Sequence, residues 1–532
     1  MLFRSVWCIG PISRHRLDHY FARLHPKHAM PKIKPTLSLA LRPRQPGASL
    51  FRWLYDEIRT AIVDGRLTPG TRLPSTRSVA DQHGIARGTV VAAFDQLATE
   101  GYIESGVGDG TFVRSINTAD RTGARAARRT HSTKPTPPHP SLSARGEALA
   151  RHPFPQLWSN RNVETFQLDR PALDAFPIKL WGRLAARRLR QAVPGLLTSS
   201  GIFGYRPLRE AIADYVGLRR GVKCTAKDVV ITTGTQQSLD LIARLTLDRG
   251  DRAWIEDPGY AGATSLLRAL GAQVIGVPVD EQGIDCEAGR KRYRQARLAY
   301  VTPSCQFPLG LTLSLERRLA LLRWAHEQGA WIFEDDYDSQ LQFSGRPLAA
   351  LRSLDPQGHV IYSNSFNKML FTSLRIGFLV LPPGLIDAAA AARSIVDRFP
   401  AVLDQATLCD FITEGHMDQH MRRMRELYEA RLDTLGRAIE RDLGGMMQLK
   451  PGQGGLQVVG WLGDGIDERA ACNAAAAQGI NSVPLSKLTI DRTLPPALVL
   501  GVASADVGAI RQAVTRLGKV LRPLQKPGRS LS

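Results

Sequence analysis

Apolar residues in the N-terminal part of the chain follow first a helical and then a strand pattern. A first helix is predicted by six apolar positions that recur on one helical face: Leu50, Trp53, Leu54, Ile58, Ala61 and Ile62. Ser75 is placed to cap a second helix that ends at His83, and a third helix is expected over about 87–100. Two short apolar runs, 102–104 and 111–113, flank a glycine-rich tip, which predicts a β-hairpin.

Further along the chain, the pattern changes to short apolar runs that alternate with helical stretches. The runs lie at Val229–Thr233, Ala253–Glu256, Leu298–Val301, Trp331–Glu334, Val360–Tyr362 and Ile376–Leu381. Strands that alternate with helices predict a mostly parallel sheet whose two faces are both covered by helices. We therefore expect an α/β domain over 163–522.

Two polar segments separate these patterned regions from each other and from the N-terminus. Residues 1–46 are rich in Arg, His and Pro, so we expect a disordered basic segment, with Met30 as the natural start. Residues 116–162 hold few large apolar residues and predict a flexible linker. Between the two segments, three helices and a hairpin predict a winged helix-turn-helix domain over 47–115.

The basic charge of the chain lies largely in the polar segments. The formal net charge is +21. Residues 1–46 hold nine Lys or Arg against one acid, and residues 114–151 hold eight against two. Such segments bind phosphate without sequence preference, but they are as often solvated linkers, so the charge favours a nucleic-acid partner without establishing one.

The cysteines and the apolar runs indicate the compartment. The six cysteines are scattered, without a pair at metal-ligand or redox spacing. This spacing favours reduced thiols in the cytoplasm and predicts no metal site. No apolar run approaches the roughly 18 residues of a membrane span, so we expect no membrane partner.

The winged helix-turn-helix predicts how the chain binds double-stranded DNA. In such a domain the third helix lies in the major groove, the second crosses the backbone and the wing meets phosphate. Arginines near the starts of the second and third helices can reach phosphates or guanine edges there. The DNA-contacting residues that we predict are Ser75, Thr76, Arg77, Arg87, Thr89, Gly110 and Thr111. A helical protein–protein module is the alternative interpretation.

Lys368 is the candidate for covalent chemistry in the second domain. A lone lysine is usually a surface residue, but Ser365 precedes this one and Arg375 follows it. A Schiff base needs an amine held at a cofactor aldehyde, and a phosphate tail needs cations and donors. Asp335, at the end of a predicted strand, can hold a pyridine nitrogen protonated, and Tyr337 lies on the same side of the strand. A solvated or metal-binding acidic loop is the alternative.

Two further motifs suit a phosphorylated aromatic ligand. Gly234, Thr235 and Gln236 follow a predicted strand and open a helix, a common phosphate cradle that is a weak signal alone. Tyr260 follows the next strand and can lie against a ring face. Taken by itself, Tyr260 is more often a core residue.

In chain order, these motifs resemble two known families. Residues 47–115 resemble the GntR family of regulators, in stretches such as Gly65-Arg66-Leu67, Leu73-Pro74-Ser75 and Glu100-Gly101-Tyr102. Residues 163–522 resemble fold-type I aminotransferases, in stretches such as Gly204-Tyr205-Arg206-Pro207, Thr302-Pro303-Ser304 and Ser373-Leu374-Arg375. The combination resembles the MocR subfamily of GntR regulators.

The resemblance implies pyridoxal 5′-phosphate as the cofactor and a role for each candidate residue. Lys368 would form the Schiff base, Asp335 would hold the pyridine nitrogen and Tyr337 the ring hydroxyl. Arg375 and Ser365 would bind the phosphate. The resemblance also implies a head-to-tail homodimer that binds two half-sites on a promoter.

The chain departs from the family pattern at several positions. Ala86 and Gly88 stand where the family usually has a serine N-cap and a helix-forming residue. At the cofactor site, the unusual residues are Cys305, Leu309, Asn367 and Gln457. No arginine occurs in Leu498–Ser504, where aminotransferases grip the substrate carboxylate, so Arg206 becomes the candidate effector-binding residue.

The sequence leads to one main hypothesis and two rivals. The main one is a regulator that senses an amine or amino acid through aldimine exchange at Lys368. The first rival is an active aminotransferase with an accessory DNA-binding domain. The second is a binding module whose cofactor site has decayed.

Overall fold

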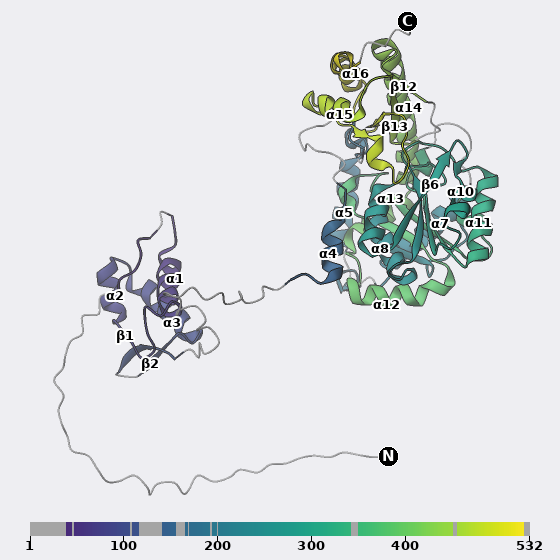
Figure 1. Cartoon of the computed structure of the whole chain (residues 1–532). Coiled ribbons are helices and arrows are strands. Elements are labelled where there is room, and N and C mark those ends of the chain that lie inside the picture. Colours follow the sequence, from purple (N-terminus) through teal and green to yellow (C-terminus); the bar gives the residue numbers. More distant parts are fainter. Residues whose placement is uncertain are drawn as a thin grey trace, which may run out of the picture. The chain divides into compact units, whose positions relative to one another are not determined.

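The computed structural model describes residues 39–44, 47–106, 109–115, 141–155, 165–168, 170–191, 194–198, 201–341, 349–450 and 455–525. They belong to two units, 1–138 and 139–532, called here the N-terminal and C-terminal units (Figure 1). Most of the predicted basic segment 1–46, most of the predicted linker 116–162 and the hairpin tip Val107–Gly108 lie outside the described residues.

The N-terminal unit is a winged helix-turn-helix, as the apolar pattern predicts. Its elements are α1 (Leu50–Val63), β1 (Arg72–Leu73), α2 (Thr76–His83), α3 (Arg87–Thr99), β2 (Ile103–Gly106) and β3 (Gly110–Val113). The strands form an antiparallel sheet in the order β1-β3-β2. Helix α2 begins and ends as predicted, because the Ser75 hydroxyl accepts a hydrogen bond from Ser78 N at 3.2 Å and Gly84 adopts φ 62°.

The apolar core of this unit includes a residue that lies before the predicted domain range 47–115. Leu39 is buried together with Leu54, Val90 and Phe94. The Gln82 side chain holds it from both sides, accepting from Leu39 N at 3.3 Å and donating to Leu39 O at 3.1 Å. Leu39 and the half-buried Leu41, which fall within the predicted basic segment, therefore pack against the helices.

Helix α3 begins without a side-chain cap, and this predicts two stabilising substitutions. Ala86 is the N-cap and makes no side-chain hydrogen bond, while a Cβ added at Gly88 would meet nothing within 4 Å. Ala86→Ser and Gly88→Ala are each expected to stabilise α3 by about 1 kcal/mol, which slows hydrogen exchange of its amides about fivefold. Gly84→Ala is the control: its left-handed φ should make exchange in α2 faster. Unchanged exchange in both α3 variants would contradict the prediction.

The C-terminal unit is built on an eight-stranded, mostly parallel sheet, in agreement with the predicted fold class (Figure 1). The strand order is β4-β11-β10-β9-β8-β5-β6-β7. Strands β11 and β7 run antiparallel to their neighbours, and the other pairs are parallel. The strands are β4 (Val229–Thr232), β5 (Arg252–Asp257), β6 (Gln273–Asp280), β7 (Gly283–Ile284), β8 (Leu298–Val301), β9 (Trp331–Asp335), β10 (Val360–Ser365) and β11 (Gly377–Val380).

Helices cover both faces of this sheet, and its central strands are therefore buried on both sides. Helices packed on one face are α8 (Thr235–Thr246), α9 (Ala261–Ala269) and α12 (Ile386–Val396). Those on the other are α5 (Ile178–Arg190), α7 (Arg206–Arg220), α10 (Cys286–Arg292), α11 (Leu315–Gln328) and α13 (Leu403–Thr413).

A second, smaller sheet of the C-terminal unit was not predicted from the sequence. Its antiparallel strands, in the order β12-β13-β15-β14, are β12 (Met447–Leu449), β13 (Gln457–Leu462), β15 (Ala497–Gly501) and β14 (Val483–Pro484). Three helices pack with it: α14 (His416–Leu443), α15 (Glu468–Ala477) and α16 (Val507–Leu521). The remaining short helices are α6 (Pro194–Thr198), η2 (Leu173–Ala175), η3 (Ser339–Leu341), η4 (Leu351–Leu354), η5 (Thr372–Leu374), η6 (Pro383–Leu385), η7 (Leu485–Leu488) and η8 (Arg522–Leu524).

One helix lies in the range for which the sequence predicts a flexible linker. Helix α4 (Ala144–Arg151) begins at Ser143, whose hydroxyl accepts a hydrogen bond from Gly146 N at 3.1 Å. It packs against α9 of the same unit. Within the predicted linker range, the described residues 144–151 are therefore a helix that packs on the C-terminal unit.

The described residues include no helix with the length and apolar character to cross a bilayer. They also bring together no group of three or more His, Cys, Asp or Glu side chains suited to hold a metal ion.

Candidate functional site

A cavity of about 180 Å³ lies in the C-terminal unit, and its walls carry all nine residues predicted for the cofactor site. Parallel strands end at the same edge of a sheet, and the loops that follow β4, β5, β9 and β10 meet there. The lining residues are Phe154, Gly234, Thr235, Gln236, Tyr260, Tyr300, Thr302, Phe307, Asp335, Tyr337, Ser365, Asn367, Lys368, Thr372 and Arg375. The roles of these residues stay predictions.

Asp335, at the end of β9, is a buried carboxylate with two donors. Tyr300 Oη donates to its Oδ2 at 2.6 Å, and Thr235 Oγ1 donates to its Oδ1 at 3.2 Å. Burial raises the pKa of Asp335 to about 6, although the Tyr300 hydrogen bond and the charge of Lys368 act in the opposite direction. The sequence did not single out Tyr300. Its only signal was a tyrosine within a buried strand, and the contact depends on the pairing of β8 with β9.

Lys368 lies in a short loop after β10 that several contacts hold in place. Its Nζ is 4.4 Å from the ring centroid of Tyr337 and 5.9 Å from that of Phe307. The neighbouring Asn367 accepts from Ile376 N at 3.0 Å and donates to Thr233 O at 3.1 Å. Asn367, one of the departures from the family pattern, thus joins the lysine loop to the turn after β4.

The turn at Gly234 leaves space that a side chain would fill. Gly234 adopts φ 133°, and a Cβ there would lie 2.8 Å from Asn367 Nδ2. The same Cβ would lie 3.6 Å from both Arg375 Nη2 and Ser365 Oγ, so these donors face the turn at which α8 begins. Arg375 has φ 52°, a left-handed conformation that is uncommon for a residue with a Cβ and that is enriched at functional sites. A guanidinium, a hydroxyl and a helix N-terminus around an open turn suit a phosphate.

Aromatic rings form one wall of the cavity. Tyr260, the N-cap residue of α9, is stacked near Tyr300, with ring centroids 6.1 Å apart and planes at 28°. Phe307 meets Tyr260 edge to face, also at 6.1 Å. These rings offer an apolar surface to a flat ligand.

Two departures from the family pattern meet at Tyr337. Gln457 Nε2 donates to Tyr337 Oη at 2.9 Å, and Cys305 Sγ lies 3.9 Å from the same oxygen. Burial raises the pKa of the Cys305 thiol well above its usual range, so it stays protonated at neutral pH. Leu309 packs beside the apolar cluster that contains Phe307.

The structure does not bring Arg206 to the cavity. Its side chain is 77% exposed and pairs with Glu210 on the same helix, α7, at 2.9 Å. Within the described residues of one chain, Arg206 therefore lies outside the site for which the sequence proposed it.

The predicted DNA-contacting residues lie at the helix starts and the wing of the N-terminal unit. Arg77 and Arg87 are exposed in the first turns of α2 and α3, where backbone N–H groups also favour phosphate. Thr76 and Thr89 are half-buried, and Ser75 caps α2.

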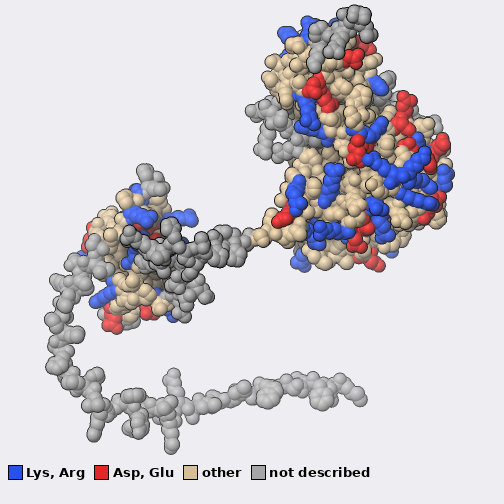
Figure 2. All heavy atoms as spheres, in the orientation of Figure 1, with Lys and Arg blue, Asp and Glu red and all other residues tan. Residues whose placement is uncertain are grey.

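An arginine that the sequence did not single out lies in β1, the strand that pairs with β3 of the wing. Arg72 lies beside Gly110, where a Cβ would come within 2.8 Å of its Nε, and its guanidinium is 6.0 Å from the centroid of the Phe112 ring. Thr111 Oγ1 pairs with Ser105 Oγ at 3.2 Å across the hairpin. By contrast, basic and acidic side chains are interspersed over the visible face of the C-terminal unit (Figure 2).

Comparison with known proteins gives matches for both units. The model of bacterial regulatory proteins of the gntR family matches residues 52–113, and that of aminotransferase class I and II matches residues 178–517. The chain is 37% identical to the probable rhizopine catabolism regulatory protein MocR of Rhizobium meliloti, over 91% of this chain and 96% of that protein. It is 31% identical to the pyridoxine biosynthesis transcriptional regulator PdxR of Corynebacterium glutamicum, over 90% of this chain and 98% of that one.

Solved structures resemble the C-terminal unit. The crystal structure of LysN, the α-aminoadipate aminotransferase of Thermus thermophilus, matches with a TM-score of 0.65 and 28% identity. The match covers 71% of this chain and 97% of LysN, which was solved with N-(5′-phosphopyridoxyl)-L-leucine.

Proposed function

This chain belongs to the MocR-type regulators of the GntR family, which join a winged helix-turn-helix to an aminotransferase class I and II domain, and on that basis we propose a specific mode of regulation. The chain binds pyridoxal phosphate at Lys368, and its binding to promoter DNA responds to an amine or amino acid. The observation that carries this proposal is the convergence of Lys368, Asp335 and the Gly234 turn on one cavity.

The residues of the cavity fit pyridoxal phosphate from end to end. The open turn at Gly234, faced by Arg375 and Ser365, suits the phosphate. The buried carboxylate of Asp335 suits the ring nitrogen at the opposite end of the ligand. When bound, the cofactor supplies an aldehyde that condenses with amines.

Each residue has a task in this proposal. Lys368 Nζ holds the aldehyde end, and Asp335 accepts a hydrogen bond from the ring nitrogen. Tyr337 donates to the ring hydroxyl, and Tyr260 packs on the ring face. The phosphate is bound by the backbone of Gly234, Thr235 and Gln236 and by the side chains of Ser365 and Arg375.

If an amine condensed with the cofactor in place of Lys368, the lysine side chain would be freed and the amine would occupy part of the cavity. Phe154 forms part of the cavity wall and is 50% exposed. It follows α4, which packs on α9, and α9 begins at Tyr260. A ligand against Tyr260 and Phe154 therefore acts on the segment that leads back to the DNA-binding domain.

We also propose that the chain acts as a head-to-tail homodimer on double-stranded DNA. Two copies of one DNA-binding domain read two half-sites, whose spacing follows from the dimer geometry. An aminotransferase with an accessory DNA-binding domain is the alternative, and steady-state transamination at about 1 s⁻¹ or faster would favour it.

Footprinting of the promoter region that adjoins the gene tests the regulatory proposal. The full-length chain is expected to protect one region of this DNA. Pyridoxal phosphate, followed by a panel of amines and amino acids, is expected to change the protected boundaries or the concentration needed for protection. A footprint that neither the cofactor nor any amine alters would contradict ligand sensing and leave DNA binding intact.

Phe154→Ala is expected to weaken the response to the amine more than cofactor binding. The half-exposed ring offers apolar contact worth about 1 kcal/mol, so the amine concentration for a half-maximal effect should rise about fivefold. The pyridoxal phosphate dissociation constant should change less than twofold, because Phe154 is not among the proposed cofactor ligands. Leu142→Ala is the matched control, since Leu142 is 63% exposed in the same segment and does not line the cavity. Equal responses of the two variants would contradict a role for Phe154.

A further inference from the structure

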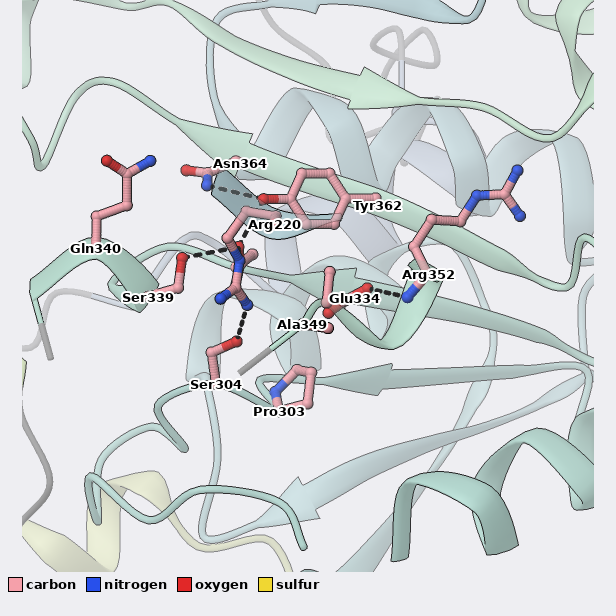
Figure 3. A network of polar contacts seen from close by, with 12 residues as sticks. Arg220, Pro303, Ser304, Glu334, Ser339, Gln340, Ala349, Arg352, Tyr362 and Asn364 are labelled. Atoms are coloured by element: carbon pink, nitrogen blue, oxygen red, sulfur yellow. Dashed lines mark hydrogen bonds and ion pairs between the residues drawn. The ribbon is translucent and has the colours of Figure 1, made fainter. Parts of the chain in front are cut away.

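A buried ion pair joins Arg220 to Asp336, the residue that follows β9, and Figure 3 shows the side chains around Arg220. Arg220, the last residue of α7, donates from Nε to Asp336 Oδ2 at 2.8 Å and from Nη2 to Asp336 Oδ1 at 3.0 Å. The exposed fraction of the side chain is 2% for Arg220 and 0% for Asp336. Neither residue is among the described residues that line the cavity.

Side chains from three other segments complete the network around this pair. Ser304, in the loop after β8, accepts from Arg220 Nη2 at 2.5 Å. Tyr362 of β10 donates to Asp336 Oδ2 at 2.6 Å, and Ser339 of η3 donates to the same oxygen at 2.8 Å. The Asp336 side chain therefore links the residue after β9 to α7, β10 and η3. Through Arg220 it is also linked to the loop after β8.

The position of Asp336 gives this network its importance for the cavity. Asp336 stands between Asp335, the last residue of β9, and Tyr337, in the turn that follows; both of these line the cavity. Successive side chains of an extended chain point to opposite sides, and Glu334, two residues earlier, is also held on the far side. Its carboxylate accepts from Leu351 N at 2.7 Å. It also accepts from Arg352 N at 2.8 Å (Figure 3).

Stability alone does not explain a buried ion pair at this place. Removing two charges from water is costly, and apolar residues of similar volume are often as stabilising or more so. Burial alone would lower the pKa of Arg220, but the charges of Asp336, Tyr362 and Glu334 and the hydrogen bond to Asp336 together outweigh this effect, so the pKa lies above its usual value. Arg220 and Asp336 thus compensate each other's charge. If either residue were replaced by a neutral one, the charge of the other would stay buried without its partner.

We propose that Arg220 and Asp336 are positioning residues of the cofactor site. Their ion pair fixes the backbone at the end of β9, so that the Asp335 carboxylate and the Tyr337 hydroxyl both face the cavity. The inference rests on the proposed function for the identity of the cofactor. The placement of β9 itself can be measured without any cofactor.

The first test is hydrogen exchange on the cofactor-free, full-length chain. In Arg220→Met, exchange of the peptide that carries residues 331–338 is expected to be at least tenfold faster, because Asp336 is left unpaired. Asp336→Asn should have a similar but smaller effect, and it also serves if Arg220→Met fails to fold. The double variant leaves no buried charge in the pair, so its exchange should lie within threefold of the unmodified chain.

Arg318→Met is the matched control. Arg318 is an equally buried arginine, but it donates to the backbone carbonyls of Leu313, Ala349 and Pro303 rather than to a carboxylate of β9. Its loss should lower thermal stability while exchange of the 331–338 peptide changes less than threefold. If Arg318→Met speeds exchange there as much as Arg220→Met does, or if the double variant is as fast as the single ones, the positioning role is contradicted.

The second test is titration of the same variants with pyridoxal phosphate, followed by visible absorbance. The dissociation constant is expected to rise at least tenfold in Arg220→Met, to return within threefold in the double variant and to stay within threefold in Arg318→Met. If the unmodified chain binds no pyridoxal phosphate, the proposed function fails, and the exchange data still decide whether the pair positions β9. If the unmodified chain binds it and Arg220→Met binds it equally well, only the positioning role fails.

Discussion

Asp335→Ala is expected to weaken pyridoxal phosphate binding by at least a hundredfold. Asp335 is the buried carboxylate that faces the cavity, and Tyr300 and Thr235 both donate to it. Removing one partner of a buried charged pair leaves the other uncompensated and costs about 3–5 kcal/mol, which is more than a hundredfold in affinity. Titration with the cofactor, followed by visible absorbance, gives the dissociation constants of the unmodified full-length chain and of the variant.

Asp338→Asn is the matched control for this experiment. Asp338 is a buried carboxylate three residues away that accepts a hydrogen bond from Leu456 N at 3.1 Å and does not line the cavity. Its substitution should change the dissociation constant less than fivefold. A similar loss in both variants would mean that the acidic loop as a whole, rather than the Asp335 carboxylate, governs binding.

Arg87→Ala is expected to weaken binding to the promoter by about ten- to a hundredfold. Arg87 is exposed at the first position of α3, the helix that we expect in the major groove. An arginine that contacts a base edge there contributes about 1–3 kcal/mol, and its loss relaxes the sequence preference. If Arg87 contacts phosphate instead, binding should weaken on all sequences and the salt dependence should fall. Fluorescence anisotropy at several salt concentrations distinguishes the two contacts.

Arg52→Ala removes the same charge from α1 and serves as the control. Arg52 is also exposed, but it lies outside the helix starts and the wing. Its loss should weaken DNA binding less than threefold. Equal losses in the two variants would indicate a general effect of net charge and would contradict the groove assignment of α3.

The grouping of the cavity residues was predictable because they follow strands with strong apolar patterns, although their roles stay predictions. Asp335, Ser365 and Gly234 each lie at or just after the end of such a strand, and parallel strands bring their carboxyl ends together. Helix α2 was predictable for a local reason, since Ser75 and Gly84 supply its cap and its stop within the helix itself.

Contacts between distant segments were not predictable in the same way. The hydrogen bond from Tyr300 to Asp335 depends on which strands are neighbours, which a single sequence does not reveal. Strands of the second sheet such as β14 are too short for a period of two to appear. Leu39 is buried in the apolar core of the N-terminal unit, and the Gln82 side chain that holds its backbone lies 43 residues away, a contact that a single sequence does not reveal.

The predicted role of Arg206 in effector binding stays a prediction, and within one chain this residue does not line the cavity. The absence of an arginine in Leu498–Ser504 made it the nearest candidate for a carboxylate-binding residue. In the structure its guanidinium instead pairs with Glu210 along the exposed face of α7. The position of a residue around the helix axis, rather than the chemistry of its side chain, decides the direction in which that side chain points.

The central claim is a covalent bond between one side-chain nitrogen and the cofactor, and borohydride reduction followed by peptide mass spectrometry tests it most directly. The full-length chain is incubated with pyridoxal phosphate, reduced and digested. We predict one dominant phosphopyridoxyl adduct, carried by the peptide that contains Lys368, and its loss in Lys368→Ala. An unmodified Lys368 peptide, or adducts spread evenly over exposed lysines such as Lys291 and Lys519, would contradict the claim.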